Sequence, residues 1–332
     1  MRQPYKRTYT CNPHKDTTNP RKALIARFYN QTRPSSLSPR AINKYTSTNF
    51  NESSSFESLN SKSIRLNNEC SLRYLTSSSY RDYINKLNRP IYLDFSSCDN
   101  LEEYIHYYYS NNIVSINFSN TKFKWIPDNM QSVKFLYLDN CQNISNIENI
   151  RKMESLIKLD LSRCWQIKDI SPAKHVSVLN VAFCKNITDF SMLGNVTHLN
   201  LTCTAINDLS ALRHVRKIIL TGCQYITADS LIELKCTYLD ISHCYNIKSI
   251  PQLTDIKHII LKGTSITNLE SLESCDTVNV EDCTLIKDFT PVYNVPHLNI
   301  SRCWQITDIS PFKNVTLETD YRFNGCEFKN VM

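Results

Sequence analysis

The sequence predicts a repeat solenoid of the α/β type, an arc of about eleven repeats of roughly 20 residues each. One parallel sheet should line its concave side, and short 3₁₀ or extended segments should cover its convex side. Three observations lead to this prediction. They are an internal duplication, a regular series of small anchor residues, and an alternating pair of aliphatic residues before each anchor.

The duplication involves a thirteen-residue stretch. Residues 162–174 return at 301–313 with 11 of 13 positions identical, and weaker copies fill the interval. Self-similarity at a period of roughly 20 to 50 residues is typical of solenoids and related arrays. A single copy has nothing to bury its aliphatic residues against, so the copies must stack, and the two ends of the stack need caps.

Each copy reads apolar-x-apolar-x-x-Cys/Thr, and the final residue of this pattern is its anchor. Successive anchors are 19 to 23 residues apart. The next aliphatic residue follows a Cys anchor by three positions and a Thr anchor by two, so the Thr copies contain a turn that is one residue shorter. The anchors are Cys98, Thr121, Cys141, Cys164, Cys184, Thr204, Cys223, Cys244, Thr264, Cys283 and Cys303.

The aliphatic pair before each anchor predicts the secondary structure. Pairs such as Leu159 and Leu161 alternate with other residues, which is the signal of a strand with one buried face. The strand and its turn use about half of each repeat, and the remainder is too short for a regular helix of about three turns. We therefore expect 3₁₀ or extended segments to complete each repeat.

This pattern resembles the leucine-rich-repeat family, whose consensus is L-x-x-L-x-L-x-x-N/C-x-L. The resemblance covers about residues 90–326. The Cys anchors are similar to the cysteine-containing subclass common in F-box adaptors, and the Asp-Ile-Ser-Pro segments look like short bacterial-type repeats. The resemblance implies a non-enzymatic protein that binds another protein through its concave or flanking surface. The alternative it implies is an F-box/leucine-rich-repeat adaptor that selects substrates for a ubiquitin ligase.

The 14 cysteines are interpreted as buried structural thiols. Eight are anchors, while Cys236 and Cys275 replace aliphatic residues; no C-x-x-C pair suggests a metal site, and no phosphate-binding or cofactor motif occurs. No apolar run is long enough to cross a membrane, and no secretory signal opens the chain. These features predict an intracellular protein of the cytoplasm or a host-cell cytoplasm, with a nuclear location as an alternative. The Asn-, Ile- and Lys-rich composition suggests an AT-rich genome, as in giant viruses.

Four segments are predicted along the chain. Residues 1–55 form a disordered basic tail, since the first 50 carry ten Lys or Arg and one acid. Nucleic-acid contact or nuclear targeting through this tail is an alternative, and a mitochondrial presequence is another. Residues 90–314 are the repeats, and 315–332 are a C-terminal cap with Leu317, Tyr321, Phe323, Cys326 and Phe328 in a closing strand or turn.

Residues 56–89 are predicted to be helical. Tyr80, Tyr83, Ile84 and Leu87 follow helical spacing with Ser79 as N-cap, and Leu66, Cys70 and Leu75 mark a preceding helix. The simplest role is a cap over the first strand, expected at residues 91–95. The alternative is a degenerate F-box that docks on a Skp1-type adaptor, because residues 59–64 are faintly similar to the second half of that module.

The residue between the paired aliphatics, and the residue two positions later, should face the concave side. Small amides and hydroxyls at these positions are expected to hydrogen-bond from repeat to repeat. Larger side chains are candidates for partner contact, because aromatic and Arg residues are typical interface anchors. These candidates are Tyr137, Arg163, Phe183, Tyr238, His243, His258, Lys262, Glu281 and Arg302. Trp165, Tyr245 and Trp304 follow their anchors directly and either reflect duplication or form a paired binding site.

Catalysis is not expected. His175, His198, His214, His243, His258 and His297 are scattered through the repeats, and none lies in a motif that couples it to a nucleophile. Asp160 and Asp240 share a position but lie four repeats apart, which is about 19 Å at the spacing of neighbouring strands. That separation is too large for the carboxylate pair of a glycosidase.

Overall fold

A computed structural model of the 332-residue chain describes residues 63–98, 101, 111–312 and 315–319. The chain divides into a unit of residues 1–61 and a unit of residues 62–332. The predicted basic tail belongs to the first unit and lies outside the described residues, as do Tyr321, Phe323, Cys326 and Phe328 of the predicted C-terminal cap.

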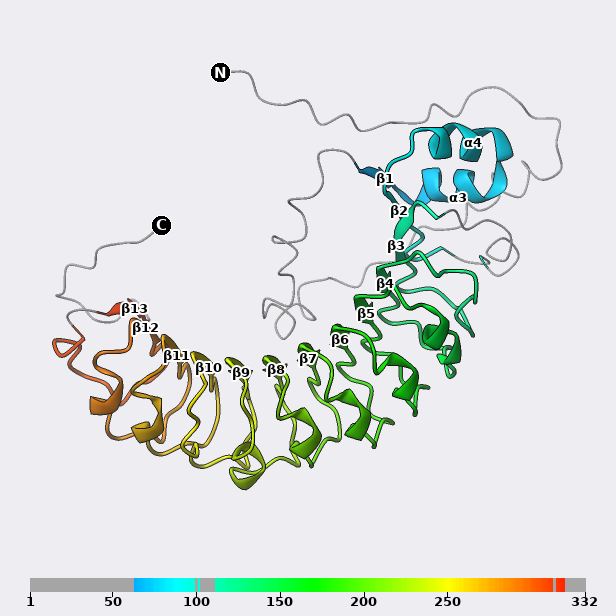
Figure 1. Ribbon diagram of the computed structural model, residues 1–332. Helices are drawn as coiled ribbons and strands as arrows, with labels where there is room; N and C mark the ends of the chain where they lie inside the picture. Colours follow the sequence, from blue (N-terminus) through cyan, green and yellow to red (C-terminus); the bar gives the residue numbers. More distant parts are fainter. Residues whose placement is uncertain (1–62, 99–100, 102–110, 313–314, 320–332) are drawn as a thin grey trace, which may run out of the picture. The chain divides into compact units, whose positions relative to one another are not determined.

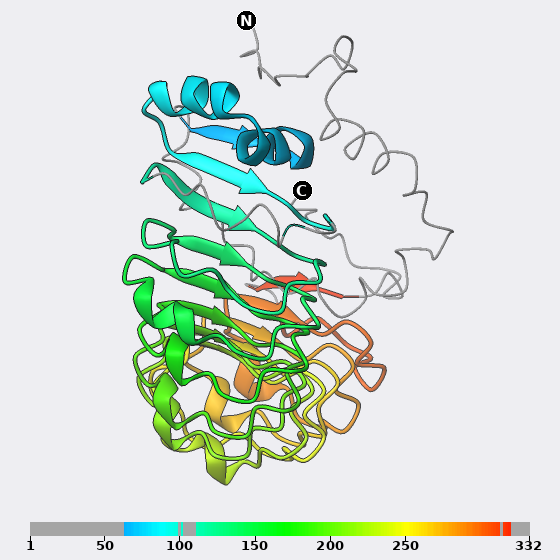
Figure 2. The same ribbon diagram turned by 90° about the vertical axis from the view of Figure 1, so that its right-hand side faces the viewer.

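One parallel sheet of thirteen strands runs through this unit in sequence order, as the repeats predict. Its strands face the inside of a curved stack and all point the same way (Figures 1 and 2). The strands are β1 (Ile64–Leu66), β2 (Ile91–Asp94), β3 (Ile113–Asn117), β4 (Phe135–Tyr137), β5 (Lys158–Asp160), β6 (Val178–Asn180), β7 (His198–Asn200), β8 (Lys217–Ile219), β9 (Tyr238–Asp240), β10 (His258–Ile260), β11 (Thr277–Asn279), β12 (His297–Asn299) and β13 (Thr316–Glu318).

The register places equivalent residues of successive repeats side by side. Leu159 of β5 is paired with Leu136 of β4 and Leu179 of β6, and all three are fully buried. The aliphatic residues that follow the anchors, such as Ile167 and Ile206, are equally buried. The alternating pairs therefore form the continuous core that the sequence predicts, and the fold is a leucine-rich-repeat solenoid.

Short 3₁₀ turns complete most repeats on the convex side, as expected (Figure 1). They are η2 (Glu148–Lys152), η3 (Ser171–Ala173), η4 (Ser191–Leu193), η5 (Ser210–Leu212), η6 (Asp229–Leu231), η7 (Glu270–Leu272) and η8 (Thr290–Val292). An Asp two residues before a Ser or Thr begins several of these turns. The Asp189 carboxylate, for example, accepts a hydrogen bond of 2.9 Å from the Ser191 amide. In the repeated Asp-Ile-Ser and Asp-Phe-Ser segments, the Asp side chain thus closes a local turn immediately before the 3₁₀ residues.

The segment before the repeats contains two helices, but their boundaries differ from the prediction. The helices are α3 (Asn68–Thr76) and α4 (Ser78–Lys86), and Asn67 and Ser77 are their N-caps. Ser79 was the wrong choice among three consecutive serines, because the amide of Tyr80 bonds to the Ser77 hydroxyl. Leu66 is also not helical; it lies in β1.

Strand β1 extends the sheet by one strand beyond the first predicted strand. Ile64 and Leu66 pair with Ile91 and Leu93 of β2. Helix α3 is tied to both strands, since the Ser71 hydroxyl donates to the carbonyl of Leu66 and accepts from the amide of Asp94. At the other end, β13 carries Leu317 of the predicted closing strand or turn and pairs with β12.

Candidate functional site

The anchors form a buried ladder of hydrogen bonds that joins successive repeats. Each anchor thiol from Cys141 onward donates to a backbone carbonyl of the preceding repeat; the Cys184 Sγ, for example, lies 3.1 Å from the Leu161 oxygen. The Thr204 hydroxyl instead donates to Leu201 of its own repeat, at 2.7 Å. Cys98 at the start of the series is only half-buried. The ladder accounts for the anchors structurally.

The ladder thiols are also chemically inert. Burial raises the pKa of Cys184 to about 12 and the pKa of Cys223 to about 11, far from the range of a reactive thiolate. Cys236 and Cys275 are buried in the aliphatic column, as predicted, and burial raises their pKa to about 12 and about 11. Among the described residues, no group of three or more His, Cys, Asp or Glu side chains could hold a metal ion.

The residue immediately before each anchor adopts a left-handed backbone conformation in all eleven repeats. The φ angles lie between 55° and 68° at these positions: Ser97, Asn120, Asn140, Arg163, Phe183, Cys203, Gly222, His243, Gly263, Asp282 and Arg302. Gly, and to a lesser extent Asn and Asp, tolerate this conformation, whereas other residues lose roughly 1–2 kcal/mol. Four large side chains occupy these unfavourable positions, and all four were predicted partner contacts.

Exposed apolar side chains gather beside this left-handed position. Of the nine large apolar side chains that are exposed in the described part of the chain, five follow an anchor by one or two residues: Trp165, Tyr225, Tyr245, Leu285 and Trp304. The loss of water from such groups drives association, and aromatic residues are frequent at the centre of interfaces. We call the four large left-handed residues together with these five the turn edge, because they lie at the carboxyl ends of the strands.

Contacts between neighbouring repeats hold the first part of the turn edge and the sheet beside it. The guanidinium of Arg163 lies 3.0 Å from the carboxylate of Asp139 and 5.4 Å from the centre of the Phe183 ring. The ammonium of Lys158 lies 5.2 Å from the centre of the Tyr137 ring. Arg163 and Phe183 are thus brought together, while Tyr137 lies within the concave sheet on β4.

Beside the second part of the turn edge, an ion-paired group spans three repeats and includes Arg302. Glu281 lies between Lys262, at 2.8 Å, and Arg302, at 3.9 Å, and its side chain is only 17% exposed. The His243 ring lies 6.3 Å from the Tyr245 ring. A Cβ atom on Gly263 would lie 2.7 Å from Nδ1 of His243, so this glycine leaves room for the imidazole.

Tyr238 and His258, the remaining predicted contacts, belong to a different surface. They are the first residues of β9 and β10, at the amino end of the concave strands, and their rings are 6.3 Å apart. The ammonium of Lys217 on β8 lies 4.4 Å from the centre of the Tyr238 ring. The nine predicted residues therefore do not make one site; most lie at or beside the turn edge, and these two lie across the sheet from it.

The predicted ladder of polar side chains on the concave face is largely wrong. Most Asp and Asn residues between the paired aliphatics accept a hydrogen bond from the backbone amide two residues later in the same repeat. Asn200, for example, accepts from the amide of Thr202 at 3.0 Å. This local hydrogen bond forms in preference to one with the neighbouring repeat, because the side chain is short and the amide two residues later lies beside it. Bonds between repeats occur at a few positions, such as Asn180 with Asp160.

Two of these residues carry carboxyl groups: Asp240 is buried and Asp160 is half-buried. Burial raises the pKa of Asp160 and of Asp240, although hydrogen bonds from Ser162 and Ser242 oppose the shift. Oδ2 of Asp240 has no hydrogen-bond partner among the described residues. The two carboxyls lie on β5 and β9, four strands apart, so they do not form a pair.

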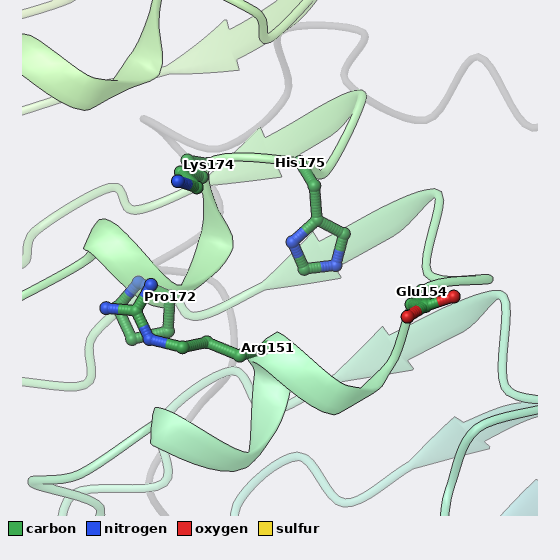
Figure 3. A pocket seen from close by; sticks show the side chains of 5 residues that line it. All are labelled: Arg151, Glu154, Pro172, Lys174 and His175. Atoms are coloured by element: carbon green, nitrogen blue, oxygen red, sulfur yellow. The ribbon is translucent and has the colours of Figure 1, made fainter.

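One hollow lies on the convex side, beside η2 and η3. Arg151, Glu154, Pro172, Lys174 and His175 line it, and their polar groups do not converge on a common point (Figure 3). The Arg151 guanidinium is bonded to Glu148 and Ser171, and the His175 ring to the Met153 carbonyl. This arrangement offers no nucleophile beside a base.

Several surface residues were missed from the sequence. Tyr225 and Leu285 follow their anchors by two positions and were not predicted as candidate contacts. Large apolar residues within a polar turn are a signal in the sequence that could have identified them. The left-handed position was missed entirely, yet Asn120, Asn140, Gly222 and Gly263 are the residues that favour it. Three further residues are the first residues of their strands: His198, Lys217 and His297. Each of these strands is only three residues long, so the sequence does not predict which side chains become neighbours.

Comparisons with known proteins do not fix a function. No family model matches the chain. It is 25% identical over 214 residues to a probable disease resistance protein of Arabidopsis thaliana, covering 59% of this chain and 11% of that protein. The chain therefore spans a small part of that relative.

Two solved structures from Listeria monocytogenes are similar. An internalin, InlF, is 17% identical with a TM-score of 0.44, and covers 63% of this chain and 76% of its own. The functional domain of InlJ, which includes a cysteine ladder, is 15% identical with a TM-score of 0.45, and covers 73% of this chain and 58% of its own. Within the residues that the structure describes here, no helix is long and apolar enough to cross a membrane.

Proposed function

We propose that this leucine-rich-repeat solenoid is a non-enzymatic binding protein whose turn edge contacts a protein partner. The observation that carries the proposal is the placement of Arg163, Phe183, His243 and Arg302 at left-handed positions. Asn or Gly would be more stable there, and Asn or Gly does occupy the same position in four other repeats. Strained residues tend to persist where the side chain has a use beyond the fold.

The exposed apolar side chains support the same surface. Trp165, Tyr245 and Trp304 each lie two residues after one of these strained positions, and each is more than half exposed. A mixture of exposed aromatic rings and Arg side chains is the composition of interface centres. The near-identical copies at Arg163–Trp165 and Arg302–Trp304 repeat this mixture seven repeats apart.

We further propose a reducing, intracellular location. The twelve cysteines in the described residues are free, and most of them are buried in the ladder or the aliphatic column. Proteins of oxidising compartments more often pair their cysteines. The ladder needs each thiol hydrogen for its bond to a carbonyl, so oxidation would disrupt it.

One observation favours the ligase-adaptor alternative as a second candidate. Tyr83 of α4 and Leu87, the C-cap of that helix, are 57% and 40% exposed, and such a pair suits contact with an adaptor of the Skp1 type. Against it, the segment is built into the sheet through β1 and Ser71. Truncation at Ile91 would therefore damage the repeats, and surface substitutions are the better test.

The experiment compares partner capture from cell lysate by four folded versions of the full chain. They are the unaltered protein, a turn-edge variant with Trp165→Gln and Trp304→Gln, a helix variant with Tyr83→Ser and Leu87→Ser, and a convex control with Met192→Gln and Ile232→Gln. The proposal predicts that a specific partner is lost with the turn-edge variant only. Loss of an adaptor with the helix variant alone would favour the ligase function, and equal capture by all four would refute the turn edge as the binding surface.

A further inference from the structure

The thirteen-residue stretch that occurs twice in the chain matches far more closely than the sequence before it. Residues 162–174 and 301–313 agree at 11 of 13 positions, whereas the twelve residues before each copy agree only at Leu159 and Leu298. Those preceding residues include strands β5 and β12, which have the same place in the fold. Duplication of a whole repeat copies the strand together with the turn. The close match is confined to the turn, which indicates a requirement specific to that part of the repeat.

The repeat fold explains some of the matching residues but not the Arg and the Trp that flank each anchor. The six repeats between the two copies have the same left-handed position without an Arg or a Trp. Before the anchor these repeats carry Phe183, Cys203, Gly222, His243, Gly263 and Asp282, and after it Lys185, Ala205, Gln224, Tyr245, Ser265 and Thr284. The turn therefore folds with many residue types, and the fold does not require the recurrence of Arg163–Trp165 and Arg302–Trp304.

Each Arg is paired with an acid at the same position of the preceding repeat. The Arg163 guanidinium is 3.0 Å from the Asp139 carboxylate, and the Arg302 guanidinium is 3.9 Å from the Glu281 carboxylate. The two Arg residues have φ angles of 61° and 60°. Ion pairs that water reaches contribute little to stability, so they do not account for an Arg in a strained conformation. They orient each guanidinium and balance its charge.

An exposed Trp lies two residues after each Arg. Trp165 is 51% exposed and Trp304 is 53% exposed. Trp is among the residues most enriched at the energetic centres of interfaces, because one ring buries a large apolar area. Since an acid already balances each guanidinium, the apolar indole, and not net charge, supplies the attraction to a partner. We call Asp139, Arg163 and Trp165 the first Arg–Trp group, and Glu281, Arg302 and Trp304 the second.

The two groups are far enough apart to be contacted separately. They follow β5 and β12, which are seven strands apart in the sheet, or about 34 Å at about 4.8 Å per strand. We propose that they are equivalent binding sites for a partner protein that carries the same apolar element twice. This inference rests on the proposed function and specifies the form of the partner. Two linked contacts raise the overall affinity well beyond that of either one, which gives a reason for two like groups on one chain.

Two versions of the full chain isolate the groups. Trp304→Gln keeps only the first group intact, and Trp165→Gln keeps only the second. Twelve-residue peptides are selected by phage display on the Trp304→Gln version, after removal of those that bind the turn-edge variant, which lacks both Trp residues. A synthetic copy of the selected peptide is the probe, and isothermal titration calorimetry measures its affinity and stoichiometry with each version. The convex control with Met192→Gln and Ile232→Gln should bind it like the unaltered chain.

We expect the peptide to bind both single-group versions with dissociation constants within about threefold of each other. The unaltered chain should bind two peptides. Two peptides joined by a Gly/Ser linker of about 36 residues, with a root-mean-square span of roughly 33 Å, match the separation of the groups. This joined probe should bind the unaltered chain at least about tenfold more tightly than the single peptide, and the gain should disappear in either single-group version.

Three results would overturn the proposal, and they have different meanings. Binding of the peptide to the first group alone, with a stoichiometry of one, would refute the paired site and leave the turn edge as a binding surface. Failure to select any peptide that depends on the Trp would contradict the proposed function as well. A dimer of the unaltered chain in sedimentation, lost in the turn-edge variant, would assign the groups to a second copy of this chain instead.

Discussion

The anchor position and the position directly before it recur with the same spacing but differ in residue type and in backbone conformation. Anchors are Cys or Thr throughout, and from Thr121 onward all are buried. The preceding residue always has a positive φ, yet it varies from Gly and Asn to Arg, Phe and His. The uniform residue type at the anchors fits their role in stabilising the fold. Variable chemistry, in a conformation that should favour uniformity, suggests a role in recognition.

The largest effect should follow from placing a charge in the ladder. Cys184→Asp should lower the free energy of unfolding by about 3 kcal/mol or more, because a buried carboxylate would be unpaired there. Cys184→Thr is the matched control, since Thr serves as anchor in other repeats, and it should cost about 1 kcal/mol. Urea denaturation followed by circular dichroism measures both. Similar losses for the two variants would mean that the ladder tolerates charge, and that the anchors are not a buried structural column.

An intermediate effect is expected where a side chain is added at a left-handed glycine. Gly263→Ala should lower the free energy of unfolding by about 1–2 kcal/mol from backbone strain, and more from contact with His243. Combining it with His243→Ala removes the contact and leaves the strain. A double-mutant cycle from urea denaturation separates the two contributions. Additive losses would show that the imidazole does not rest against this glycine.

Replacing a buried carboxyl should have an effect that depends on pH. The pKa of Asp240 is raised by burial, so the neutral form is favoured in the folded state. Any stability that this carboxyl contributes is present below its unfolded pKa and is lost as pH rises through the folded pKa. Asp240→Asn keeps the Oδ1 acceptor for Ser242.

The Asn variant should therefore unfold at a higher temperature than the unaltered protein at pH 7, and this advantage should shrink towards pH 3. Asp94→Asn is the control, because Asp94 holds the equivalent position on β2 and is only half-buried. Thermal unfolding at several pH values measures the difference. An advantage for Asp240→Asn that is unchanged across the range would rule out the burial of charge as its cause.

The core was predictable because it depends on residues that recur. Leu159 and Leu161 alternate in the sequence and are buried in the structure, and Cys236 and Cys275 fill aliphatic positions as expected. Strand β1 was not predicted, since Ile64–Leu66 is short and no anchor follows it. Pairing with β2 and the contacts of Ser71 stabilise it, and these depend on residues distant in sequence.

The candidate surfaces were predictable only in part. Large side chains at repeat positions could be identified, including Arg163 and Arg302, but their backbone conformation could not be inferred from those residues. The partition into two surfaces depends on which end of a strand a residue occupies. Tyr238 begins its strand and His243 follows the end of the same strand. Sequence position alone did not separate them.

The most direct test of the account is the stability of a variant that replaces all four large left-handed residues with Asn. Arg163→Asn, Phe183→Asn, His243→Asn and Arg302→Asn would relieve roughly 1 kcal/mol or more of strain at each position, and would lose the contacts with Asp139 and Glu281. The account predicts a free energy of unfolding in urea equal to or above that of the unaltered protein. A value lower by more than about 1 kcal/mol would show that these side chains stabilise the fold, and would contradict their assignment to partner binding.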